Sequence, residues 1–231
     1  MKLTKIACAV GALVLSGAAA AEFSANIGAT SNYVWRGVSQ TGNDAAISGG
    51  LDFGHESGFY AGTWASNVDF GGDKGAEVDL YAGFGNEIGT SGVGYDVGAI
   101  YYYYPNFDDS DFAELYGSFS YKYFSAGLNY IVSSQVDKTP GNDIFIKGDL
   151  YYYLSGSFEV APTWTLGGTF GYYDFKEDGR DGIDTSYKHF QLDVTKGAGD
   201  FGDFTFTVSK ADKESGDDDT LVFVSWAKTF D

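Results

Sequence analysis

The chain has 231 residues, with 33 Gly, 18 Tyr and 19 Phe but only 3 Pro, and its formal net charge is −18. Aromatic residues favour strands and Gly weakens helices, so this composition indicates an all-β protein. The deficit of Lys and Arg argues against a nucleic-acid partner, because binding phosphates needs a basic surface.

The N-terminal segment has the pattern of an export signal. Two lysines precede an apolar run that ends in the small residues at 19–21, where signal peptidase reads small side chains. We expect residues 1–21 to be a cleaved signal and residues 22–231 to form one domain. The apolar run is too short to cross a hydrocarbon layer of about 30 Å comfortably as a helix. The one cysteine, Cys8, lies inside the signal, so we expect no disulfide to hold the mature domain.

The rest of the chain alternates apolar with small or polar side chains in segments of about ten residues, as strands of a membrane barrel do. The clearest of these segments are 23–30, 77–84, 93–99, 124–130, 165–172, 190–195 and 203–208. Short turns are expected at 54–58, 87–92, 122–123, 161–163 and 197–200. Long, acidic loops are expected at 37–44, 68–75, 105–111, 133–142, 176–186 and 212–219. This alternation predicts an antiparallel transmembrane β-barrel of about twelve strands, with periplasmic turns and extracellular loops.

A soluble β-sandwich could be built from the same strands, with the polar face toward solvent. Aromatic residues near strand ends favour the barrel, because they suit the girdles at membrane interfaces; they are Trp35, Tyr101, Tyr103, Trp164, Tyr172 and Trp226. The last strand, which ends in Phe230, resembles the signal that the barrel-assembly machinery of the outer membrane reads. It departs from that signal because Lys228 interrupts the apolar alternation and Asp231 follows Phe230.

A ten-residue motif lies next to the first predicted loop. The segment Ser-Asn-Tyr-Val-Trp-Arg-Gly-Val-Ser-Gln, at 31–40, resembles the N-terminal signature of the TorF-type porins, a proteobacterial family of conserved hypothetical outer-membrane proteins. Length, signal, acidity and Tyr/Gly-rich hairpins are similar over essentially the whole chain. The resemblance implies an outer-membrane barrel with porin activity, and it implies no particular substrate.

Strand alternation also predicts which charged residues face the lumen. The pore-lining candidates are Arg36, Asp52, Glu77, Asp79, Asp96, Glu114, Lys147, Asp149, Asp193 and Asp203. Carboxylates around a lumen concentrate cations, so the sequence predicts a cation-preferring pore for passive diffusion of small hydrophilic solutes. The same carboxylates could instead solvate a plugged interior or pair with Lys147, and Arg36 could be a structural ion-pair partner. The alternative function is a closed barrel that interacts at the surface and does not conduct.

Signs of an enzyme are few. His189 and Asp193 share a predicted inward face, but nothing in the sequence places a nucleophile such as Ser209 beside them. The chain has no P-loop, zinc-type spacing or Rossmann fingerprint, and its acidic loops do not follow the EF-hand pattern. We therefore expect no catalytic residue, cofactor or metal, and the partners predicted are outer-membrane lipid and lipopolysaccharide. The inward tyrosines could fill the lumen or form a stacking track for sugars; they are Tyr102, Tyr104, Tyr151 and Tyr153.

Overall fold

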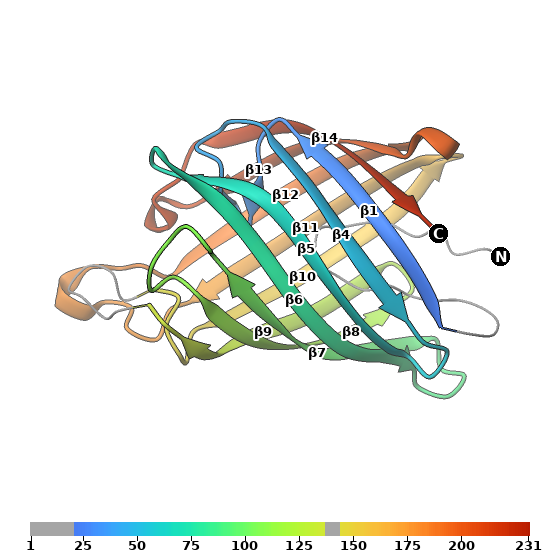
Figure 1. The fold of residues 1–231 in the computed structure, drawn as a ribbon, viewed down its shortest axis with the longest axis horizontal. Helices are drawn as coiled ribbons and strands as arrows, with labels where there is room; N and C mark the ends of the chain where they lie inside the picture. Colours follow the sequence, from blue (N-terminus) through green and yellow to red (C-terminus); the bar gives the residue numbers. More distant parts are fainter. Residues whose placement is uncertain (1–20, 137–143) are drawn as a thin grey trace.

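The computed structural model describes residues 21–136 and 144–231, and in this part of the chain twelve strands close into an antiparallel barrel (Figure 1). The barrel strands are β1 (Glu22–Thr30), β4 (Ala46–Gly54), β5 (Phe59–Phe70), β6 (Asp73–Glu87), β7 (Val93–Tyr103), β8 (Phe112–Tyr121), β9 (Phe124–Ser134), β10 (Leu150–Ala161), β11 (Trp164–Asp174), β12 (Tyr187–Gly197), β13 (Asp203–Ala211) and β14 (Thr220–Phe230). Each strand pairs with its neighbours in sequence, and β1 closes the ring by pairing with both β4 and β14. The predicted barrel and its strand number are confirmed.

The remaining elements are small. Strands β2 (Val34–Trp35) and β3 (Val38–Ser39) form a separate two-stranded sheet. Three short 3-10 helices lie in connections: η1 (Arg180–Gly182), η2 (Gly199–Phe201) and η3 (Lys213–Ser215). Within the described ranges no helix is long and apolar enough to cross a membrane. The predicted signal lies outside these ranges except for Ala21, so its cleavage stays a prediction.

Alternation along each strand sorts side chains between the two faces of the barrel wall. On β13, Phe204 and Phe206 are each 47% exposed on the outside, whereas Thr207 next to them is buried in the interior. Apolar side chains are exposed on the outer face of strands all round the ring, among them Phe23, Ile47, Leu80, Phe119, Leu154, Phe190 and Val222. The predicted assignment of faces is therefore confirmed for these strands.

The two ends of the barrel differ, as predicted. The short turns and the ends of β1 and β14 that carry the chain termini lie at one end, which we call the inner end (Figure 1). Most long connections lie at the other, which we call the outer end. One predicted long loop, 68–75, is wrong, because Gly71 and Gly72 alone connect β5 to β6. Both glycines have positive φ, which permits a two-residue hairpin turn and lets the strands continue to the turn.

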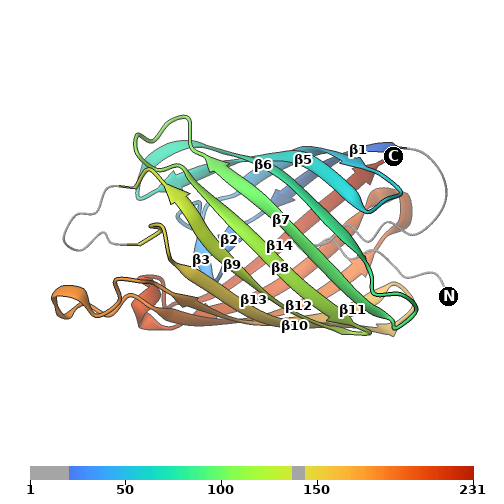
Figure 2. The same ribbon diagram turned by 90° about the horizontal axis from the view of Figure 1, so that it is seen from below.

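The first outer connection does not project into solvent. Between β1 and β4 the chain turns into the barrel, and β2 and β3 lie inside the ring of strands (Figure 2). We call β2, β3 and their turn, residues 34–39, the inward hairpin. Its Trp35 packs against every cluster of buried hydrophobic side chains in the barrel interior. The prediction that Trp35 belongs to a membrane-interface girdle is therefore wrong.

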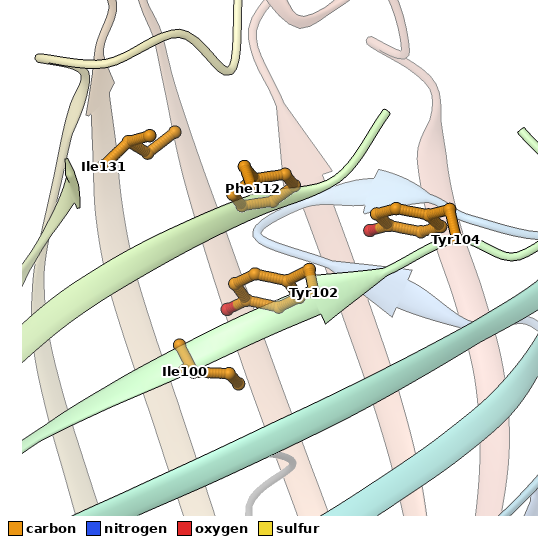
Figure 3. Packing of buried hydrophobic residues seen from close by; sticks show 5 residues of the cluster. All are labelled: Ile100, Tyr102, Tyr104, Phe112 and Ile131. Atoms are coloured by element: carbon orange, nitrogen blue, oxygen red, sulfur yellow. The ribbon is translucent and has the colours of Figure 1, made fainter. Parts of the chain in front are cut away.

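One cluster of buried hydrophobic side chains shows how the outer half of the interior is filled. This cluster projects inward from β7, from β8, from β9 and from the residue that follows β7 (Figure 3); its members are Ile100, Tyr102, Tyr104, Phe112 and Ile131. Tyr102 and Ile131 are each 1% exposed. The inward tyrosines Tyr102 and Tyr104 thus pack the outer half rather than forming an open track.

Candidate functional site

The turn of the inward hairpin has an unusual residue at its tip. Val34 pairs with Ser39 and Trp35 with Val38, which leaves Arg36 and Gly37 as a two-residue turn. Their φ angles are 48° and 88°, the positive pair found in type I′ turns, where Asn-Gly is strongly preferred. Holding a residue such as Arg in this left-handed conformation costs about 1–3 kcal/mol. Contacts of the Arg36 side chain must therefore offset the cost of its backbone.

The guanidinium group of Arg36 makes those contacts with the barrel wall. Its two terminal nitrogens donate to the two oxygens of Glu114 on β8, at 2.8 and 2.7 Å. Its central carbon lies 4.2 Å from the ring centres of both Trp35 and Tyr151, and 5.2 Å from that of Tyr173. Planar two-point pairing with a carboxylate, combined with stacking on aromatic faces, is recognition specific to guanidinium.

Glu114 is oriented by the wall as well as by Arg36. The Tyr102 hydroxyl donates to its Oε2 at 3.2 Å, and the Asn129 side-chain amide donates to the same atom at 2.9 Å. The side chains of Arg36 and Glu114 are only 8% and 1% exposed. The predicted pairing of Arg36 with a lumenal carboxylate is thus present, as a buried ion pair.

Other residues of the 31–40 motif anchor the base of the hairpin. The Asn32 side-chain oxygen accepts bonds from Ser39 Oγ at 2.7 Å and from Thr41 Oγ1 at 3.3 Å. The Tyr33 hydroxyl donates to Glu77 Oε1 on β6 at 2.9 Å. A Cβ on Gly37 would lie 2.5 Å from the Cβ of His189, so only Gly lets the turn rest against β12. The motif identified by resemblance is therefore the segment that builds and seats the inward hairpin.

Asp79 is the exception among the carboxylates of the outer half. It is fully buried on β6, two residues from Glu77 on the same face. Glu77 accepts bonds from the Tyr33 and Tyr104 hydroxyls, whereas neither oxygen of Asp79 has a hydrogen-bond partner among the described residues. An unpaired buried carboxylate is energetically costly, so Asp79 is a strained point of the interior.

The inner half of the lumen is polar and acidic. Asp52 on β4 accepts bonds from the Asn26 amide at 3.0 Å and from the Tyr81 hydroxyl. Asp96 on β7 accepts a bond from the Tyr60 hydroxyl at 2.7 Å, and that hydroxyl also contacts the Tyr116 hydroxyl.

Asp193 completes this acidic wall on β12. It accepts bonds from Thr207 Oγ1 at 2.7 Å and from the Gln191 amide at 3.0 Å. Asp203, at the start of β13, is half-buried. Hydroxyl and amide donors hold these carboxylates in place without neutralising them, so the inner half keeps negative charge.

Two predicted lumenal residues lie elsewhere. Lys147 is exposed in the turn before β10, and the prediction that it faces inward from a strand is wrong. Asp149 is fully buried just before β10, where it accepts the backbone N–H groups of Ile146 and Lys176 and so braces two loops. The sequence pattern failed here because β10 begins only at Leu150, after a longer connection than predicted. Part of that connection, residues 137–143, lies outside the described residues.

His189 has one side-chain hydrogen-bond partner among the residues that the structure describes. Its Nε2 contacts the Tyr151 hydroxyl at 2.8 Å, while its Nδ1 and the hydroxyl of Ser209 have no hydrogen-bond partner in the described part of the chain. In the same ranges, no three His, Cys, Asp or Glu side chains come together as they would around a metal ion.

Three aromatic residues face the lumen although the sequence pattern did not predict it: Tyr60, Tyr116 and Trp35.

Solved structures of similar fold are porins of very different sequence. The KdgM porin has a TM-score of 0.59 at 7% identity, over 90% of this chain and 98% of its own. The KdgM porin in complex with disordered oligogalacturonate gives 0.57 at 8% identity over the same shares. The NanC porin gives 0.52 at 11% identity, again over 90% and 98%. At identities this low, the structural similarity shows that these proteins share the fold of this chain.

Sequence comparison gives the family. No curated protein matches the chain. The family model described as "Bacterial protein of unknown function (Gcw_chp)" matches residues 15–227. This match spans nearly the whole chain, and the protein belongs to that family.

Proposed function

We propose that the protein is an outer-membrane channel of the porin type, which conducts small hydrophilic solutes with a preference for cations and is narrowed by the inward hairpin. Exposed apolar side chains surround the barrel, whereas a soluble monomer rarely exposes a large contiguous apolar surface. A closed ring of strands leaves no unpaired edge, as a protein in lipid requires. The resemblance of residues 31–40 to TorF-type porins agrees with this proposal.

The observation that carries the proposal is the sign of the charges facing inward. Carboxylates of Asp52, Asp96 and Asp193 line the inner half of the lumen. Every lysine within the described strands lies on the opposite, outward parity: Lys74, Lys188, Lys196, Lys210 and Lys228. Lys196 and Lys228 illustrate this, since each lies over an exposed aromatic ring on the outside. A lumen with one sign of charge concentrates counter-ions of the other sign.

The test is the conductance of the refolded mature chain in a planar bilayer under a KCl gradient. We expect a reversal potential on the cation-selective side, and a shift toward zero in the double variant Asp96→Asn/Asp193→Asn. Asp108→Asn, which removes a charge from an exposed outer loop, is the matched control and leaves the reversal potential nearly unchanged. Anion selectivity in the wild type would contradict the proposal.

A closed, non-conducting barrel is the second candidate function. The observation that favours it is the filling of the outer half, where Tyr102, Tyr173 and Ile131 are at most 1% exposed around the inward hairpin. Folding and insertion are monitored separately, by resistance to unfolding in detergent on gels. The protein could be folded and inserted and still show no conductance, both as wild type and in a variant with a destabilised inward hairpin. In that case the closed barrel replaces the channel as the proposed function.

A further inference from the structure

We propose that the outer half of the lumen contains a binding site for a guanidinium group, occupied in this structure by Arg36, which takes solutes bearing that group when Arg36 is absent or withdrawn. The site itself needs only the fold. Its use by a passing solute rests on the proposed channel function.

The barrel wall supplies most of the site without the hairpin. Glu114 provides both acceptor oxygens, and Tyr151 and Tyr173 provide aromatic faces 4.2 and 5.2 Å from the guanidinium carbon. Tyr102 and Asn129 both donate to Glu114 Oε2, the oxygen that also accepts from one terminal nitrogen of Arg36, so the wall orients this carboxylate by itself. Since these partners belong to strands β7 to β11, the site keeps its form when the guanidinium group leaves.

The chemistry of the site selects guanidinium over ammonium. A guanidinium group is planar and can donate to both oxygens of one carboxylate while its face lies against an aromatic ring. An ammonium group is a compact, strongly hydrated charge that cannot make this two-point planar contact. The same geometry that binds Arg36 therefore distinguishes two classes of cationic solute.

The conformation of the turn allows Arg36 to be replaced without loss of the hairpin. Arg36 has a φ of 48°, a position that Asn adopts far more readily before Gly in a type I′ turn. Trp35 holds the hairpin independently, with ring centres 5.7 Å from Tyr102, 6.2 Å from Tyr173 and 6.4 Å from Phe112. The variant Arg36→Asn therefore keeps a favoured turn and the aromatic packing while it empties the site.

Electrostatics favours a cationic occupant of the emptied site. Without Arg36, the carboxylates of Glu77, Asp79 and Glu114 remain in the outer half. On the inward faces of the strands that the structure describes, neither Lys nor Arg is available to balance them. Burial strengthens the attraction between a carboxylate and a cation in contact with it, so this contact is stronger inside the barrel than the same contact in water.

Thermal unfolding of the refolded protein in detergent tests the proposal with methylguanidinium as the probe and methylammonium as the control. In Arg36→Asn, methylguanidinium well above its dissociation constant raises the unfolding midpoint by about 5 °C, and methylammonium does not. The wild type shows no such difference because Arg36 fills the site. The double variant Arg36→Asn/Glu114→Gln loses the response because the carboxylate is gone.

Poor folding of Arg36→Asn does not remove the test. Methylguanidinium present during refolding then raises the folded yield of Arg36→Asn but not of the double variant. The proposal is overturned if neither midpoint nor yield responds, if methylammonium works equally well, or if the double variant responds as strongly as Arg36→Asn.

The thermal measurement also separates this proposal from the proposed channel. It needs no conduction, so a midpoint shift in a barrel that never conducts leaves the site standing and removes the channel. In a conducting barrel, methylguanidinium blocks the current of Arg36→Asn more strongly than methylammonium does. A conducting barrel without the thermal response leaves the channel standing and removes the site.

Discussion

The outer and inner halves of the lumen both contain carboxylates and tyrosines, but these residues have different partners in the two halves. In the outer half Glu114 is neutralised by Arg36 and Glu77 is bonded to the tyrosine hydroxyls of the loop and wall. In the inner half Asp52 and Asp96 receive only neutral donors and keep their charge available. Loop residues reach Glu77 and Glu114 in the outer half, whereas Asp52 and Asp96 in the inner half are bonded by strand residues alone.

The tyrosines differ between the halves in a parallel way. Inner tyrosines lie over glycines of the adjacent strand: Tyr81 over Gly62, Tyr60 over Gly83, Tyr116 over Gly98 and Tyr153 over Gly127. Glycine permits this close approach because it has no Cβ. Outer tyrosines such as Tyr102 and Tyr173 pack instead against Trp35 of the hairpin. The inner rings follow the wall, and the outer rings fill the space between wall and hairpin.

Replacing Arg36, the cation of the outer half, has the largest expected effect on stability. We expect Arg36→Ala to lower the free energy of unfolding by about 3–5 kcal/mol, because Glu114 is left buried and uncompensated. Urea titration in detergent measures the effect. The double variant Arg36→Met/Glu114→Gln should recover most of the loss, and a single variant as stable as the wild type would show that the ion pair contributes nothing.

A matched pair of glycine substitutions compares the rigidity of the two halves. Gly37→Ala places a Cβ 2.5 Å from the Cβ of His189 at a φ of 88°, so we expect a loss of about 1–3 kcal/mol. In Gly127→Ala the new Cβ meets only the far end of the Tyr153 ring, which can swing away, and the expected loss is below about 1 kcal/mol. Unfolding midpoints measured side by side decide the comparison. Equal losses would mean that the halves do not differ in packing.

Asp79 should respond in the opposite direction from its neighbour. Asp79→Asn replaces a fully buried carboxyl group that has no partner by an uncharged amide, so we expect a gain in stability on the order of 1 kcal/mol. Glu77→Gln weakens bonds from Tyr33 and Tyr104, so it should destabilise the protein instead. Both changes are read from urea titrations at neutral pH. A loss of stability in Asp79→Asn would reveal a partner for this carboxylate.

The smallest expected effect belongs to an outer loop that stands apart from the hairpin. Backbone N–H bonds from Ser186 and Thr185 lower the pKa of Asp178 below its ordinary value. A lowered pKa in the folded state gives stability that is present at neutral pH and is lost as the pH falls through that lowered value. Protection of the Thr185 and Ser186 amides against hydrogen exchange, measured relative to their intrinsic exchange rates at each pH, should therefore fall on acidification. Asp178→Asn should abolish this dependence, and release of the inward hairpin over the same pH range would contradict the separation.

The sequence alone determined the barrel wall. Alternation with a period of two is a property of each strand by itself, so it predicted about twelve strands and placed Asp52, Glu77, Asp79, Asp96 and Glu114 on the inward face. The alternation of short and long connections likewise predicted the two ends of the barrel. It failed at Gly71-Gly72 and before β10, where turn geometry rather than alternation sets the strand ends.

Only the tertiary structure decided what occupies the lumen. The direction of the first connection depends on contacts between distant residues, such as Arg36 with Glu114, which are 78 positions apart. An aromatic side chain such as Trp35 suits both the membrane interface and the barrel interior, so the sequence alone could not predict which of the two it occupies. The ten-residue motif drew attention to the right segment, but its inward course follows from partners on strands that only the closed barrel brings together.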